Sequence, residues 1–148
     1  MGRKRATPGH VLEFVVDDSR GYAQYLGRHP QYGDGILVRP TPVAERPSLT
    51  ADLFAGGYVT FYPASAAVAH GLVEVIGALP YKGLPHRFRR AGAREGGKIL
   101  TWIIEDSHGE IVRQELAAEE RRLPIAAIWN HEMLLHRVSK HWRPEDEE

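Results

Sequence analysis

The chain contains no cysteine. This absence excludes disulfides, thiolate zinc sites, iron–sulfur clusters and a cysteine nucleophile. No apolar run approaches the roughly 20 residues that a membrane-spanning helix needs. The opening stretch MGRKRATPGH has no apolar segment after its basic residues, so it does not read as a secretory signal. We therefore expect a soluble cytoplasmic protein that has no membrane partner.

The chain also lacks net charge, since 19 basic side chains balance 19 acidic ones. Residues 1–97 hold 12 basic and 8 acidic side chains, and residues 98–148 hold 7 and 11. A dedicated nucleic-acid binder is usually basic over a whole face, so we do not expect a nucleic-acid partner. There is no G-x-S-x-G motif, and the serines lie in turn or polar stretches without an evident base nearby, so a serine triad is not indicated.

The length of 148 residues fits one domain, and the chain has no repeat and no low-complexity linker. We predict a single domain over residues 1–148, with flexible tails at 1–7 and 143–148. In the first half, glycine and proline recur at short intervals, which is typical of short strands joined by turns.

Two strand pairs are predicted in this half. HVLEFVV and YAQYLGRH flank the turn DDSRG and predict a hairpin. GILVRP and GYVTFYP predict a second pair. The segment TPVAERPSLTADLFAG between them contains two prolines, so we expect a loop with at most one helical turn.

The middle of the chain predicts one short helix and more strands. ASAAVAHG is rich in alanine and indicates a short helix that ends at Gly71 in a left-handed conformation. VEVIGALP indicates a strand. KILTWIIEDSHGEIVRQEL predicts a hairpin with its turn at residues 106–109, and Leu100, Trp102 and Ile104 alternate onto one of its faces.

The last segment predicts a long helix from Pro124 to Trp142. Ile128, Leu135 and Trp142 recur every seven residues, with Val138 beside them. The expected fold class is therefore α+β: a strongly bent, mostly antiparallel sheet or partial small barrel, with one short helix and a long C-terminal helix packed on it.

Three histidines within this segment, in WNHEMLLHRVSKHW, raise the question of a metal site. Zinc-protease helices carry H-E-x-x-H, which brings both imidazoles to one side, whereas this chain has H-E-x-x-x-H. At that spacing His131, His136 and His141 splay by about 140° from one to the next, so they cannot share one ion. We expect His131 to be buried and neutral near pH 7, and His136 and His141 to lie at the edge or in solvent. No metal, cofactor or catalytic residue is predicted.

GAREGGKI has the G-x-x-x-x-G-K spacing of a phosphate-binding loop. Ile99 replaces the hydroxyl residue that would hold magnesium, and a strand pattern rather than a helix follows. We interpret this match as a coincidence in a hairpin region.

HRFRRAGAR gathers Arg87, Arg89, Arg90 and Arg94 around Phe88. Guanidinium groups bind phosphates and carboxylates in a forked geometry, so a nucleic-acid-binding module is one alternative. Stacking aromatics are not interleaved as single-strand binders require, and the simpler interpretation is a strand edge kept soluble by charge.

Three stretches together resemble the immunity protein 26 family of bacterial polymorphic toxin systems. They are PGHVLEFVVDDSRGYAQYLG at the start, HGLVEVIGALP in the middle and LPIAAIWNHEMLLHRVSKHW at the end, and they span most of residues 8–142. The resemblance implies a cytoplasmic antitoxin that neutralises a cognate toxin by direct binding. One departure is the absence of the tryptophan expected after Gly71, where Leu72 and Val73 stand.

Some members of this grouping are described as similar to a phosphotriesterase, which implies a metal-dependent hydrolase as an alternative. This chain could build such a site only from residues distant along the sequence, such as His10, His29, His70 and His108.

For the toxin-binding surface we select GRHPQYGDG and the arginine cluster, because polar loops that carry an anchoring tyrosine or arginine are typical of interfaces. The predicted partner-binding residues are Arg28, His29, Tyr32, Arg87, Arg89 and Arg90.

Overall fold

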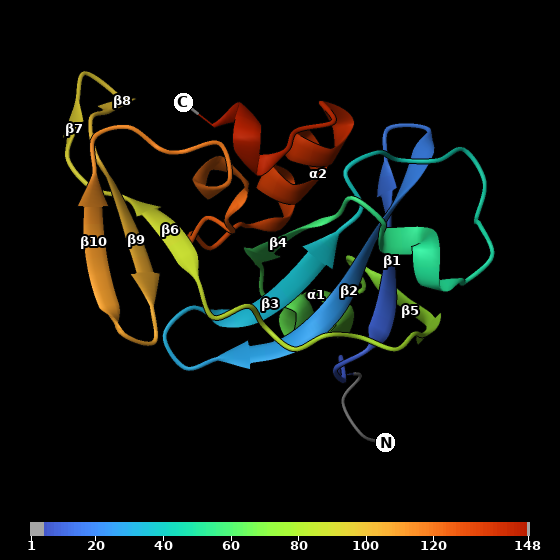
Figure 1. The fold of residues 1–148 in the computed structure, drawn as a ribbon. Coiled ribbons are helices and arrows are strands. Elements are labelled where there is room, and N and C mark those ends of the chain that lie inside the picture. The colour runs from blue at the N-terminus through green and yellow to red at the C-terminus, as the bar shows by residue number, and fades with distance from the viewer. Residues whose placement is uncertain (1–4, 148) are drawn as a thin grey trace.

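The computed structural model describes residues 5–147 and has the predicted α+β class, with mostly antiparallel sheets and few helices (Figure 1). The larger sheet contains β1 (His10–Val16), β2 (Ser19–His29), β3 (Gly33–Val38), β4 (Tyr58–Phe61) and β5 (Glu74–Ala78). The smaller sheet contains β6 (Phe88–Ala91), β9 (Trp102–Asp106) and β10 (Gly109–Arg113), beside a hairpin of β7 (Arg94–Glu95) and β8 (Lys98–Ile99). The helices are α1 (Ala64–Ala69), α2 (His131–Ser139) and the 3-10 turns η1 (Ala51–Phe54), η2 (Glu120–Arg122) and η3 (Pro144–Asp146).

The larger sheet has the strand order β4-β3-β2-β1-β5, with every pair antiparallel. Both predicted strand pairs are confirmed. Asp17 and Asp18 form the first turn between the paired residues Val16 and Ser19, and Asp17 has a positive φ of 52°, which aspartate tolerates better than most residues. The single helical turn expected in the long loop is η1, and Gly71 ends the α1 region with φ 72°.

Successive side chains of a strand point to opposite sides of a sheet. In the larger sheet, apolar side chains on both sides are covered by other parts of the chain. Leu12 and Phe14 of β1 face a core shared with α1 and α2, where Leu134 and Val138 are fully buried. Val11 faces the opposite side, where it packs with Leu53 and Phe54 of the η1 region. The η1 turn and the loop before it therefore cover the second face of the larger sheet.

The smaller sheet has the order β10-β9-β6. The predicted turn at residues 106–109 is confirmed, and Trp102 and Ile104 are buried on one face. Leu100 lies before the strand and is exposed, so its predicted place on that face is wrong. In the β7–β8 hairpin, Gly96 and Gly97 both have positive φ (57° and 81°), as a two-residue turn requires, and this accounts for the phosphate-loop spacing.

Residues 124–129, predicted as the start of a helix, are instead an extended seam between the two sheets. Trp129 N donates to Phe61 O of β4 (2.8 Å), and Ala126 N donates to Arg89 O of β6 (2.8 Å). The edges of β4 and β6 carry backbone groups that need partners, and an extended segment satisfies both edges at once. The prediction of one bent sheet or partial barrel is therefore replaced by two sheets joined along this seam.

The long helix from Pro124 to Trp142 is wrong, since α2 covers only His131–Ser139. Asn130 is the N-cap, and its side chain accepts a hydrogen bond from Met133 N (2.8 Å). The buried stripe shifts accordingly: Leu134 is fully buried, whereas Ile128 is 65% exposed. Trp142 follows the helix and packs edge-on against Trp129 at a ring distance of 5.3 Å.

The C-terminal residues differ from the predicted flexible tail. Pro144 in η3 is buried, and Arg137 forms an ion pair with Glu147 at 3.3 Å. At the other end, Ala6 packs against the main core. The remaining parts of the two predicted tails, residues 1–4 and 148, lie outside the described residues.

Candidate protein-binding surface

Four aromatic rings meet where the β2–β3 turn approaches the smaller sheet. Phe61 and Phe88 are buried with ring centres 5.5 Å apart, and they form the base of the group. His29 lies 5.6 Å from Phe88, and Tyr32 lies 5.0 Å from Phe61. We call these four residues together with Glu105 the turn cluster. Its outer members, His29 and Tyr32, are only partly buried and reach the surface.

A hydrogen bond fixes the turn cluster to the smaller sheet. Tyr32 Oη donates to Glu105 Oε1 at 2.5 Å. Burial, together with this bond to a carboxylate, raises the pKa of Tyr32 to about 12, so the phenol remains a donor at neutral pH. Arg90 lies on the same face of β6 as Phe88, and its guanidinium is 3.9 Å from Glu105 and 2.8 Å from Glu110. Aromatic and charged groups thus lie side by side in one patch.

A cavity of about 550 Å³ opens beside the turn cluster. Its walls come from the β2–β3 turn, the segment of residues 83–86 and the β9–β10 turn. That segment lies close over β3, because a Cβ on Gly35 would be 2.2 Å from Leu84 Cδ2. Glycine at position 35 is therefore what allows Leu84 to close one side of the cavity.

The structure brings some of the predicted partner-binding residues together and separates others. His29 and Tyr32 are in the turn cluster, and Arg90 is paired with its acidic neighbours. Arg28 is exposed near the end of β2, where it pairs in register with Asp34 of β3. Arg87 is turned toward the buried carboxylate of Glu120, at 3.5 Å.

The prediction that Arg89 binds a partner is wrong, because its side chain is fully buried and cannot contact one. Alternation along β6 places it opposite Arg90, where its guanidinium lies 4.2 Å from the ring centre of Trp102. Its Nη2 donates to the carbonyl oxygens of Arg121 (3.0 Å) and Pro144. Burial lowers the pKa of Arg89 to about 10, which still leaves it charged at neutral pH.

The separation of these arginines also bears on the nucleic-acid alternative. Of the four arginines in the cluster, Arg89 is buried, Arg87 and Arg90 are paired with carboxylates, and Arg94 lies on the β7–β8 hairpin. They do not form the continuous basic surface that phosphate binding uses.

The histidines proposed for a hydrolase do not converge. Within residues 5–147, no group of three or more His, Cys, Asp or Glu side chains could hold a metal ion. His10 Nδ1 accepts from Thr7 N (2.9 Å), and His29 Nδ1 accepts from Gln31 N (3.0 Å). His70 and His108 are exposed in separate turns.

His131, which opens α2, is partly buried, whereas full burial was expected. Its Nδ1 lies 2.7 Å from Tyr62 Oη. Burial lowers the pKa of His131, in agreement with the predicted neutral form near pH 7. His136 and His141 are exposed, as expected.

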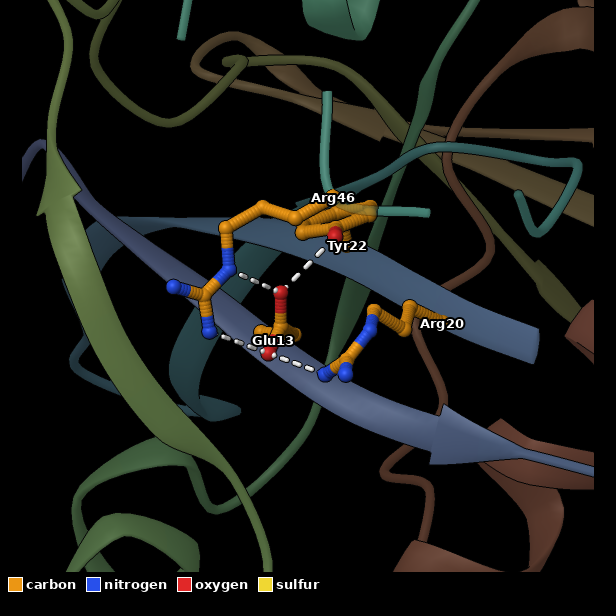
Figure 2. A network of polar contacts seen from close by, with 4 residues as sticks. All are labelled: Glu13, Arg20, Tyr22 and Arg46. Atoms are coloured by element: carbon orange, nitrogen blue, oxygen red, sulfur yellow. Dashed lines mark hydrogen bonds and ion pairs between the residues drawn. The ribbon is translucent and has the colours of Figure 1, made fainter. Parts of the chain in front are cut away.

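A second group of polar side chains surrounds Glu13 on β1, which is only 4% exposed (Figure 2). Arg46 makes a forked pair with both carboxylate oxygens, each at 2.8 Å, and Tyr22 and Arg20 complete the group. Chiefly because of Arg46, the pKa of Glu13 falls to about 2. Each carboxylate oxygen of Glu13 already accepts two hydrogen bonds, so it has no free position for a ligand. The contacts with Arg46 fix the loop between β3 and η1 to the larger sheet.

Sequence reasoning missed much of the cavity wall, including Leu84, His86, Glu105, Asp106 and Ser107. One signal was available: the stretch around Leu84 is a glycine- and proline-containing loop, and loops on a rigid scaffold frequently carry binding residues. Glu105 had no such signal, because it was read only as part of a hairpin.

Comparison of the chain with protein-family models, with curated proteins and with solved structures gave no match. In the part of the chain that the structure describes, no helix is long and apolar enough to cross a membrane.

Proposed function

We propose that this chain is a cytoplasmic immunity protein that neutralises a cognate toxin by direct binding, without chemistry of its own. The carrying observation is the convergence of two predicted binding stretches. GRHPQYGDG (27–35) and HRFRRAGAR (86–94), far apart in the sequence, meet around the turn cluster and its cavity through the contacts of His29 and Tyr32 with Phe88. The family resemblance of the three sequence stretches supports the same function.

The chemistry of this surface suits a protein partner. Tyrosine and arginine are the residue types that contribute most to protein interfaces, particularly when they are rigidly held. Tyr32 is held by Glu105 and Arg90 by Glu110, so little side-chain entropy is lost when a partner binds. Gln31, His86 and Asp106 are exposed in the cavity wall and supply a polar rim.

The test is titration calorimetry with the toxin encoded beside the gene for this chain. Gln31→Glu and His86→Glu should each weaken binding at least roughly tenfold, because an added negative charge at the rim opposes the partner's complementary groups. Their melting temperatures should match that of the parent chain, since both positions are exposed. Lys140→Glu, at the end of α2, is the matched control and should bind like the parent.

Two outcomes would overturn the proposal. One is that the chain neither binds this toxin nor protects cells that produce it. The other is that both rim variants bind the toxin with parent affinity, which would exclude this surface.

A further inference from the structure

A second cavity, of about 600 Å³, shares Gly83 and Pro85 with the first and lies against the η1 region. We call it the η1 cavity. Its volume falls within the range of about 300–1,000 Å³ that is typical of small-molecule sites. Its walls are largely apolar and come from β2, β3, β4, η1 and residues 79–85; they include Leu26, Leu37, Phe54, Val59, Leu79 and Tyr81.

The charged side chains that line the η1 cavity are Lys82 and Arg122, and both are cationic. Among the described residues, neither makes an ion pair or a side-chain hydrogen bond. Arg122 also lines an adjoining cavity of about 310 Å³, where the charges of Arg143 and Glu145 offset one another. The η1 cavity therefore combines apolar walls with an excess of positive charge.

The walls are held in place by hydrogen bonds within the chain. Gln24 Nε2 donates to Leu79 O at 2.9 Å and fixes one wall, while Arg39 Nη1 donates to Leu53 O at 2.9 Å and fixes η1. A Cβ on Gly57 would lie 2.8 Å from Val38 O, so glycine lets the chain after η1 approach β3 closely. A cavity formed before the ligand arrives needs little reorganisation on binding.

From this combination we propose that the η1 cavity binds a small aromatic carboxylate. The apolar body contacts the walls that carry Phe54, Val59 and Tyr81, and the carboxylate pairs with Arg122 and Lys82. A guanidinium group binds a carboxylate through two parallel hydrogen bonds, which gives the anion both affinity and orientation. This site is distinct from the proposed toxin surface, and its test uses no toxin.

The test compares three probes of one shape: 2-naphthoate, 2-naphthalenemethanol and 2-naphthylmethylammonium. Binding is followed by calorimetry and by NMR shifts of the amides of Gly57 and Val59. The naphthoate should bind at least roughly tenfold more tightly than the alcohol, because only the anion pairs with the arginine, and the ammonium compound should bind most weakly.

Variants at neighbouring arginines provide a matched control. Arg122→Glu should weaken naphthoate binding at least roughly tenfold, whereas Arg121→Glu, the same charge change one residue away and outside the cavity wall, should change it less than about twofold. Ala55→Trp should abolish binding by filling the cavity while leaving the fold intact, since Ala55 is exposed on its rim.

Equal affinity for the three probes, equal effects of the two arginine changes, or no naphthoate binding at about 1 mM would each overturn the proposal.

Discussion

Tyr32 Oη and Glu105 Oε1 are 2.5 Å apart, and their hydrogen bond ties the β2–β3 turn to β9 of the other sheet. Because the acceptor is a carboxylate, the bond should contribute more than a bond between neutral groups.

Tyr32→Phe removes this bond and leaves the ring in place. We expect the free energy of unfolding to fall by about 1–2 kcal/mol, because the partly buried carboxylate of Glu105 loses its donor. Denaturant titration measures the loss. Tyr81→Phe removes an exposed hydroxyl and should change stability by less than about 0.5 kcal/mol. Equal effects of the two changes would contradict the role given to the bond.

Glu13 should make the protein sensitive to acid. Its pKa falls from 4.5 to about 2 in the folded state, so its stabilisation is fully present above pH 4.5 and is lost as pH falls from there toward 2. The difference corresponds to about 3 kcal/mol at neutral pH. Glu13→Gln should remove this part of the pH dependence in denaturant titrations between pH 7 and pH 3. Glu45→Gln, on the exposed loop, should retain it.

The corrected position of α2 predicts which apolar side chains stabilise the protein. Leu134→Ala should cost about 2–5 kcal/mol of unfolding free energy, because Leu134 is fully buried and its loss leaves a cavity. Leu135→Ala should cost less, since Leu135 is partly buried, and Ile128→Ala should cost least. Thermal or chemical denaturation gives the order. A larger loss for Ile128→Ala would favour the long helix instead.

Arg89 and Arg90 are neighbours on opposite faces of β6 and should respond very differently to substitution. Arg89→Ala should destabilise the protein by about 2–4 kcal/mol, because it leaves a cavity beside Trp102 and removes the donor of two buried carbonyl oxygens. Arg90→Ala should cost less than about 1 kcal/mol, since its ion pair with Glu110 is exposed to solvent. A loss of less than about 1 kcal/mol for Arg89→Ala would show that Arg89 is not a structural residue.

His131 should titrate below the ordinary histidine pKa of 6.5, because burial disfavours its charged form. The unfolded chain then takes up the proton more readily, so the neutral ring supports folding above pH 6.5 and this support is lost as pH falls. NMR titration of the ring protons locates the midpoint. A midpoint above 6.5 would mean that the bond to Tyr62 does not involve a neutral imidazole.

The sequence by itself determined the hairpins and the short helix. Turn residues such as Asp17 and Gly109 accept positive φ, and strands with β-branched and aromatic residues flank them, so these hairpins follow from neighbouring residues alone. The short α1 helix and its end at Gly71 likewise follow from residues that are neighbours in the sequence.

Tertiary structure decided the seam, the burial of Arg89 and the assembly of the turn cluster. Residues 124–129 have apolar residues that a helix could use, but the open edges of β4 and β6 offer backbone partners that only an extended segment can reach. That pairing places Ile125 next to Arg89 and encloses the Arg89 side chain on the inner face. Tyr32 and Glu105 meet for the same physical reason: their contact depends on how two sheets join, and no residue near either one in the sequence carries that information.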